Sequence, residues 1–326
     1  MIRLAVDLAG ADTPEEDLCR GAVEAMKNHD ELFLYLCGHA ERLSPVLEEA
    51  ALPGRYTIVD SPVAVTNDDD PMTAFKQEDA SIVKAMRFAH DGQADGVITC
   101  GATGTVLVSS IMILGKLRGL RPILAVELRG KNDRPFLLLD CGANIDSRAE
   151  LYLAFARLGD AYMRCIGCDA PRIALLSNGA EDKKGCAAVK EAHALLRAEP
   201  LRFIGNIEAT QALSGETDVI VCDGFHGNIL LKSIEGTAKT VIREMEEALG
   251  DTPEARAAAE KVRQKYDYNT QGGAVLLGVS RPVMKGHGSA TGEAVAKMIV
   301  RMADLVRNGF IDKVNSAAEK KQECKS

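Results

Sequence analysis

The chain has 326 residues, of which 46% are hydrophobic and 26% charged, and its formal net charge is −8. This balance is typical of a globular protein with a sizeable core. The acidic charge, the absence of Trp and an aromatic content of 4% argue against nucleic acid as a partner, because such binders need basic surfaces and aromatic stacking platforms. No run of about 18 uncharged apolar residues occurs, so no membrane-spanning helix is expected. The apolar run at 1–7 is too short for a signal peptide.

The nine cysteines are an odd number and lie mostly in apolar runs. A reduced Cys behaves there as a small hydrophobic residue, which indicates a reducing compartment without structural disulfides. We therefore expect a cytoplasmic protein. Cys165 and Cys168 form a C-x-x-C pair, but a zinc site would need a second pair at matching spacing. A packing role is favoured for both, and neither a metal nor a cofactor is predicted.

Short runs rich in Val, Ile and Leu alternate with helical periodicity along the chain. In chain order we predict a strand at 2–7, a helix at 14–28 with Thr13 as its N-cap, a strand at 32–37 followed by a helix, a strand at 96–100, a helix at 103–116, a strand at 136–140, a helix at 148–164, a strand at 173–176, a helix at 185–198, a strand at 219–222, a helical region extending to 266, and a helix at 290–308.

Strands that are apolar throughout are typical of strands buried on both faces. Their alternation with helices predicts an α/β protein with a mostly parallel, doubly wound sheet. We expect a single domain over 1–315, followed by a charged tail at 316–326.

Five glycine-containing turns follow predicted strands. They span 7–14, 99–105, 140–144, 177–185 and 223–228. Ligands of doubly wound sheets bind beyond the carboxyl ends of the strands, so all five are expected at one edge. Glycine permits close backbone approach, and the N–H groups of a following helix attract anions. One such turn is more often a plain connection, but five together favour a composite phosphate site.

Other site signatures do not occur in the sequence. The P-loop, the dinucleotide-binding glycine motif, the G-x-S-x-G elbow and H-E-x-x-H are all missing. His287 lies between two glycines before the last predicted helix. It is either a general acid or oxyanion donor, or a surface His packed against its own loop.

Several of these motifs resemble the bacterial phosphate acyltransferases of phospholipid synthesis, and the resemblance extends over nearly the whole chain. The most specific matches are Asp223-Gly224-Phe225 with Gly227-Asn228 and Leu231-Lys232, Gly205-Asn206-Ile207-Glu208, and Gly272-Gly273-Ala274 with Leu276-Leu277-Gly278. Asp140 with Gly142-Ala143-Asn144, Lys285 with His287-Gly288-Ser289, and Gly119, Arg121 and Pro122 add to it.

The resemblance implies a Rossmann-like three-layer α/β/α fold related to phosphotransacetylases. It implies transfer of a fatty acyl group from acyl–acyl carrier protein to inorganic phosphate, which makes acyl phosphate for phospholipid synthesis. It further implies a homodimer that associates peripherally with the membrane and supplies a membrane-bound glycerol-phosphate acyltransferase.

In this chemistry phosphate is the nucleophile, so positioning and charge stabilisation are the main tasks of the protein. We expect Lys184 to neutralise charge, Asn228 to orient the carbonyl or phosphate, and His287 to act as a polariser or acid. The expected phosphate- and substrate-binding residues are Gly10, Asp12, Gly101, Thr103, Gly104, Asn144, Asp223 and Gly227, with Asn144 near the phosphate.

The sequence departs from the family pattern in four turns. The departures fall at 9–12, 101–104, 177–181 and 287–291, where this chain has Ala11, Ala102, Ala180 and Ala290. They leave two alternatives open: an acetyl-phosphate-forming subunit that resembles a glycine reductase component, and a non-catalytic paralogue that binds acyl carrier protein.

The helical region 230–266 coincides with the protruding helical pair that the resemblance implies for dimerisation and membrane contact. Val241, Ile242, Met245 and Leu249 recur at helical spacing among charged residues. An amphipathic helix that faces a second subunit is favoured over one that inserts into lipid.

Overall fold

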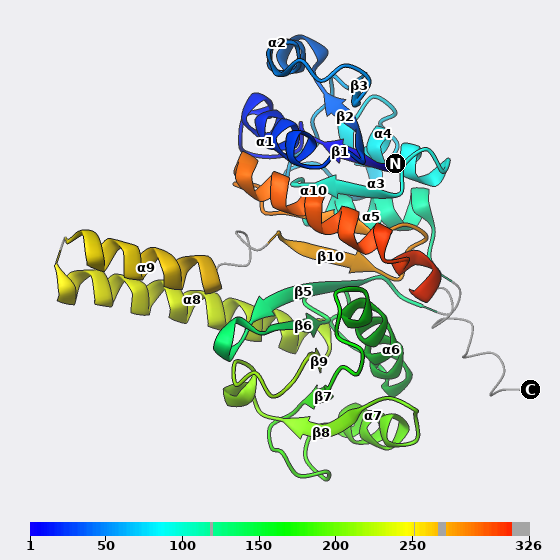
Figure 1. The fold of residues 1–326 in the computed structure, drawn as a ribbon. Coiled ribbons are helices and arrows are strands. Elements are labelled where there is room, and N and C mark those ends of the chain that lie inside the picture. Colours follow the sequence, from blue (N-terminus) through cyan, green and yellow to red (C-terminus); the bar gives the residue numbers. More distant parts are fainter. Residues whose placement is uncertain (118–119, 251, 267–271, 315–326) are drawn as a thin grey trace, which may run out of the picture. The chain divides into compact units, whose positions relative to one another are not determined.

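The computed structural model describes residues 1–117, 120–250, 252–266 and 272–314. The chain forms two compact units (Figure 1): unit 1 comprises Met1–Pro122 and Gly272–Ser326, and unit 2 comprises Ile123–Gln271. The predicted tail at 316–326 and Gly119 lie outside the described residues. The single domain over 1–315 stays a prediction.

Unit 1 contains six strands and the helices that connect them. Its elements are β1 (Ile2–Asp7), α1 (Glu15–Asn28), β2 (Leu32–Gly38), α2 (Ala40–Ala50), β3 (Tyr56–Asp60), α3 (Pro71–Ala74), α4 (Ser81–His90), β4 (Gly96–Thr99), α5 (Thr103–Ser109), a π-helical turn (Ser110–Leu114), β10 (Ala274–Leu277), β11 (Val283–Lys285) and α10 (Gly292–Arg307).

The strands of unit 1 follow the order β3-β2-β1-β4-β11-β10. All neighbours are parallel except β10 and β11. The strand order reverses between β1–β3 and β4, so right-handed connections place α1 and α4 on opposite faces. α10 packs against α1 and α4 against β1, which buries the apolar strands β1 and β4 from both sides.

Unit 2 contains five strands and a long helical hairpin. Its elements are β5 (Ile123–Arg129), a 3-10 turn (Lys131–Asp133), β6 (Pro135–Leu139), α6 (Ala149–Cys165), β7 (Ile173–Leu176), α7 (Ala187–Arg197), β8 (Phe203–Ile207), a 3-10 turn (Ala209–Gln211), β9 (Val219–Val221), α8 (Gly224–Leu249) and α9 (Pro253–Tyr266).

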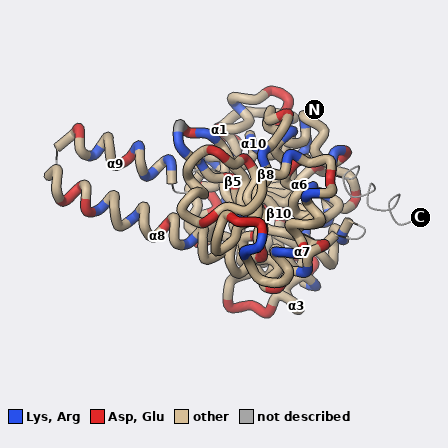
Figure 2. The backbone as a smooth tube through the Cα atoms, turned by 90° about the horizontal axis from the view of Figure 1, so that it is seen from below, with Lys and Arg blue, Asp and Glu red and all other residues tan. Residues whose placement is uncertain are grey.

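The strands of unit 2 follow the order β5-β6-β9-β7-β8, and only β5 runs antiparallel to its neighbour. α6 packs on β6 and β9 and against α7. α8 and α9 run side by side as a hairpin that extends away from these strands, with acidic and basic residues along both helices (Figures 1 and 2). The predicted mostly parallel sheet with helices on both sides is confirmed.

Three predicted element boundaries were wrong. Thr13 is not the N-cap of α1: Pro14 occupies that position, and the Thr13 hydroxyl donates to the Ala290 carbonyl oxygen at 2.8 Å. The helix predicted at 103–116 changes to π-helical hydrogen bonding after Ser109. The helical excursion begins at Gly224 rather than at 230, because the Asp223 side chain caps α8 there.

Among the described helices, none combines the length and apolar character needed to cross a membrane.

Candidate active site

In unit 1, three loops meet at the carboxyl ends of the parallel neighbours β1, β4 and β11. A Cβ added to Gly10 would lie 3.2 Å from the Cα of Gly101, so the first two loops touch through their glycines. The Asp12 amide donates to the Gly288 carbonyl oxygen at 2.8 Å, which joins the first loop to the third. The predicted residues of the turns after β1 and β4 are therefore brought together with the loop of His287.

The buried carboxylate of Asp7, at the end of β1, holds these loops together through hydrogen bonds. Its side chain is 3% exposed and accepts hydrogen bonds from Ser81 Oγ at 2.6 Å and Thr99 Oγ1 at 2.7 Å. Thr99 Oγ1 accepts in turn from the Gly101 amide at 3.0 Å. Burial raises the pKa of Asp7. Sequence reasoning treated Asp7 only as the start of a turn, although an Asp that directly follows the apolar run Leu4-Ala5-Val6 is itself a signal.

Lys285, at the end of β11, is a positively charged side chain of this loop cluster. Its side chain is half-buried, and burial lowers its pKa while the charge of Asp12 favours the ammonium form. A desolvated ammonium gains more from binding an anion than a solvated one does. The sequence pointed to Lys285 only through the family resemblance and gave it no role.

The remaining predicted residues of unit 1 lie at the surface of the same loops. Thr103 and Gly104 are exposed at the start of α5, where Ala102 provides no side-chain cap for the first N–H groups. His287 is exposed, and its Nδ1 lies 2.8 Å from Ser289 Oγ. The ring is thus held by its own loop, and the choice between an acid and a surface His stays open.

In unit 2, the Asp140 carboxylate organises the loop that follows β6. It accepts from the amides of Gly142, Ala143 and Asn144 at 3.1, 3.0 and 2.7 Å, and from Asn144 Nδ2 at 2.7 Å. Burial raises the pKa of Asp140, and these donors oppose that rise. The side chain of Asn144, predicted near the phosphate, is therefore used at least in part to hold its own loop.

The first turn of α8 packs directly on this loop. The Gly224 amide donates to the Asn144 carbonyl oxygen at 2.7 Å. A Cβ on Gly227 would lie 1.9 Å from the Asp140 carbonyl oxygen, so only glycine fits at that position. Asp223 caps the helix by accepting from the His226 amide at 2.9 Å. Asp223 and Gly227, predicted as substrate residues, thus have a structural role that the sequence pattern did not reveal.

The turn after β7 is arranged around a second glycine. Gly185 has a φ of 100°, and its amide donates to Asn178 Oδ1 at 2.9 Å. This is the left-handed region that glycine favours. Lys184 is exposed beside it, and Asn228 is half-buried one turn into α8.

A cavity of about 560 Å³ opens between this turn and the start of α8, entirely within unit 2. Its polar lining includes residues of the two turns, and its apolar lining includes residues of β7, α7 and α8. Neither Lys184 nor Asn228 lines it, whereas Cys186 and His226, which sequence reasoning missed, both do. Its lining residues include Tyr152, Ser177, Cys186, Val189, Asp223, His226 and Leu230.

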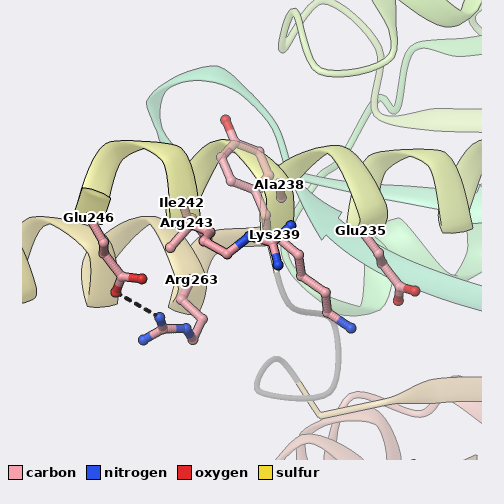
Figure 3. A pocket seen from close by; sticks show the side chains of 8 residues that line it. Glu235, Ala238, Lys239, Ile242, Arg243, Glu246 and Arg263 are labelled. Atoms are coloured by element: carbon pink, nitrogen blue, oxygen red, sulfur yellow. Dashed lines mark hydrogen bonds and ion pairs between the residues drawn. The ribbon is translucent and has the colours of Figure 1, made fainter. Parts of the chain in front are cut away.

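A smaller hollow of about 250 Å³ lies between α8 and α9 (Figure 3). Lys239, Arg243 and Arg263 line it, and Arg263 pairs with Glu246 at 3.1 Å across the hairpin. It contains none of the predicted site residues. Val241 and Leu249 on α8 are 44% and 56% exposed. Dimer contact and lipid contact both remain predictions for this hairpin.

Within the described ranges, no group of three or more His, Cys, Asp or Glu side chains is arranged to hold a metal ion. None of the eight described cysteines forms a disulfide, and this includes the C-x-x-C pair Cys165 and Cys168.

Comparison with known proteins adds a family to this geometry. A model of the family described as "Fatty acid synthesis protein" matches residues 2–313. The phosphate acyltransferase of Shouchella clausii is 37% identical over 317 residues, which cover 94% of this chain and 95% of that protein. The phosphate acyltransferase of Clostridium novyi is 32% identical over 331 residues, covering 98% and 99%.

Two solved structures share the fold at low identity. The EutD phosphotransacetylase from Staphylococcus aureus superposes with a TM-score of 0.61 at 15% identity over 93% of each chain. A branched-chain phosphotransacylase from Enterococcus faecalis gives a TM-score of 0.59 at 16% identity, covering 93% of this chain and 99% of that chain. At these identities the likeness shows the α/β fold alone. The family match and the full-length relatives go further: the chain belongs to the fatty acid synthesis protein family and is an acyltransferase.

Proposed function

We propose that the chain transfers a fatty acyl group from acyl–acyl carrier protein to inorganic phosphate, and that the acyl phosphate formed serves phospholipid synthesis. The observation that carries the proposal is the three-loop cluster of unit 1, where glycine backbone and the half-buried Lys285 lie together in a chain whose full-length relatives are phosphate acyltransferases.

The loops of unit 1 are proposed to hold the phosphate. The backbone at Gly10 and Gly101 allows close approach, and the N–H groups at Thr103 and Gly104 are free of a side-chain cap. Lys285 supplies the charge that an incoming phosphate dianion needs. Asp12 is then a positioning residue for Lys285 rather than a direct ligand, since like charges repel.

Lys184, Asn228 and His287 are proposed to keep the roles that the family resemblance implies. A phosphate oxygen attacks the thioester carbonyl carbon, an oxyanion develops, and the C–S bond then breaks. Asn228 is proposed to orient the carbonyl, and the exposed Lys184 to attract the negatively charged donor. His287 is proposed to polarise the reacting groups as the charge develops.

We further propose a homodimer that meets the membrane at its surface and passes its product to a membrane-bound glycerol-phosphate acyltransferase. Val241 and Leu249 are exposed apolar residues of the long amphipathic helix α8. They support a contact of this helix with a second subunit or with lipid.

The test is a reaction of purified protein with acyl–acyl carrier protein, in parallel with acyl–coenzyme A, with and without phosphate. We expect phosphate-dependent release of the carrier thiol and an acyl phosphate that hydroxylamine traps as a hydroxamate. Turnover of short acyl thioesters alone would favour the acetyl-phosphate subunit. Tight binding of the carrier protein without thiol release, at any chain length, would favour the non-catalytic paralogue.

A further inference from the structure

The cavity of unit 2 contains a histidine that is fixed on one side and open on the other. His226 Nδ1 lies 2.8 Å from both carboxylate oxygens of Asp223. The Tyr152 hydroxyl donates to Asp223 Oδ2 at 3.1 Å, which also holds the carboxylate in place. The carboxylate holds the Nδ1 proton and leaves Nε2 as the reactive nitrogen. His226 Nε2 has no partner among the described residues, and the side chain is 62% exposed at the cavity.

The cavity itself is suited to a thin, partly polar chain. The apolar walls formed by Val189, Leu230 and their neighbours face two polar turns. Ser177 lines it, and the hydroxyl oxygen of this residue is buried and has no hydrogen-bond partner in the part of the chain that the structure describes. A buried hydroxyl without a partner is costly, so a ligand that pairs with it is favoured. The thiol-bearing arm of an acyl donor, which carries both amide and methylene groups, has this character.

We propose that this cavity binds the thiol-bearing arm of the acyl donor and that His226 is the catalytic acid for the leaving thiolate. The inference rests on the proposed function. As phosphate oxygen bonds to the acyl carbon, the C–S bond breaks, its electron pair moves to sulfur, and the Nε2 proton of protonated His226 passes to that sulfur. Asp223 stabilises the imidazolium before transfer, and solvent restores the proton afterwards. In the reverse direction neutral His226 removes the thiol proton.

Tyr152 and Asp223 are positioning residues in this scheme. They hold the imidazole through Nδ1 and do not contact the donor's sulfur. Because Asp223 also caps α8, its replacement would disturb the helix as well as the histidine. The direct test therefore changes His226, whose side chain is mostly exposed and can be altered without disturbing the core.

The experiment compares His226→Gln and His226→Ala with the wild type on two donors of the same acyl chain. One is an alkyl thioester, whose thiol has a pKa of about 8.5. The other is an aryl thioester, whose more acidic thiol leaves without a proton. We expect both variants to lose about 100-fold in kcat with the alkyl donor, in line with general acid catalysis. With the aryl donor they should stay within about threefold of the wild type.

His90→Gln provides the matched control. His90 Nδ1 also lies 2.8 Å from a carboxylate oxygen, that of Asp91, but it is exposed at the end of α4 and lines no described cavity. This variant should behave as the wild type with both donors. An equal loss with alkyl and aryl donors in the His226 variants would indicate a structural role and overturn the assignment of the acid. Unchanged rates with the alkyl donor would overturn it as well.

Binding of the thiol-bearing arm in the cavity can be measured separately, through the reactivity of Cys186. Cys186 is exposed and lines the cavity, so a saturating acyl thioester should slow its alkylation by iodoacetamide at least about tenfold. Equal alkylation with and without the donor would place the arm elsewhere. If the wild type forms no acyl phosphate from acyl–acyl carrier protein, the proposed function fails. If it does and the His226 variants match it, only this inference fails.

Discussion

Two buried aspartates show how single residues shape the candidate site. Asp7 and Asp140 each lie at the carboxyl end of a strand. Asp7 accepts hydrogen bonds from Ser81 and Thr99 and from the backbone of Ala9 and Gly10, and Asp140 accepts from the amides of the loop that follows it. The sequence pattern placed the glycines correctly. It could not show that the carboxylates face inward, because Ser81, a main partner of Asp7, lies 74 residues away.

Replacing Asp7 should change how stability depends on pH. Its pKa is raised in the folded state, so between the unfolded and folded pKa values the native protein binds more protons than the unfolded chain. The contribution of Asp7 to stability is therefore full below the unfolded value of 3.8 and declines as the pH rises through the folded pKa. The free energy of unfolding of the wild type minus that of Asp7→Asn should fall from pH 4 to pH 8 in urea titrations. A difference that rises with pH would contradict the buried, desolvated carboxylate.

Lys285→Gln should weaken phosphate binding specifically. A charge-assisted hydrogen bond contributes about 1.5–3 kcal/mol. Its loss corresponds to a rise of roughly 10- to 100-fold in KM for phosphate, with little change in KM for the acyl donor. Steady-state kinetics with phosphate as the varied substrate measure this effect. Lys297→Gln is the control, because Lys297 is exposed and paired with Glu293 at 2.8 Å. A phosphate KM within twofold of the wild type would remove Lys285 from the site.

At the scale of elements, the six predicted strands were confirmed, but β3, β5, β8, β10 and β11 were missed, although β10 is buried throughout. β3 has no fully buried residue, and it lies at the edge of the strand order in unit 1. Its sequence therefore lacks the apolar run on which the prediction depended. The packing of one element on another could not be predicted from the sequence either. Both α1 and α10 were predicted, but their contact joins segments about 270 residues apart.

That contact depends on a glycine in the middle of α1. A Cβ on Gly21 would lie 1.9 Å from the Gly292 carbonyl oxygen at the start of α10. Because this obstacle is backbone, Gly21→Ala should destabilise unit 1 by about 1–3 kcal/mol.

Gly236→Ala is the matched substitution for that experiment. Gly236 lies within α8 and has open space around the added Cβ. Alanine should stabilise that helix by about 0.5–1 kcal/mol. Urea unfolding of both variants measures the two effects. If Gly21→Ala were as stable as the wild type, the close packing of α1 on α10 would be wrong.

At the scale of the whole molecule, the amino-acid composition does not predict the division into two compact units. No linker rich in Gly, Pro or Ser separates 1–122 from 123–271, and unit 1 is completed only by the C-terminal segment. Such a division depends on which distant segments pack together, so sequence periodicity cannot supply it. The buried cysteines, however, report on each unit separately, since three of them lie in each: Cys19, Cys37 and Cys100 in unit 1, and Cys141, Cys165 and Cys222 in unit 2.

Thiol labelling should therefore follow the units. Only the thiolate reacts, and burial raises the pKa of Cys19 and of Cys100 to about 12. At pH 8 such a thiol is ionised to about one part in 10⁴, so native labelling among the described cysteines should be confined to Cys186 and, more slowly, Cys168.

With Cys186 replaced by Ser to remove the fast background, mass spectrometry after a short pulse of reagent should reveal the buried thiols as urea rises. Because each unit has its own core, Cys19 and Cys100 should become reactive at one urea midpoint. Cys141 and Cys222 should share a second midpoint, which need not equal the first. Different midpoints for Cys19 and Cys100 would show that unit 1 does not unfold as one cooperative body, although two separate stretches of the chain build it.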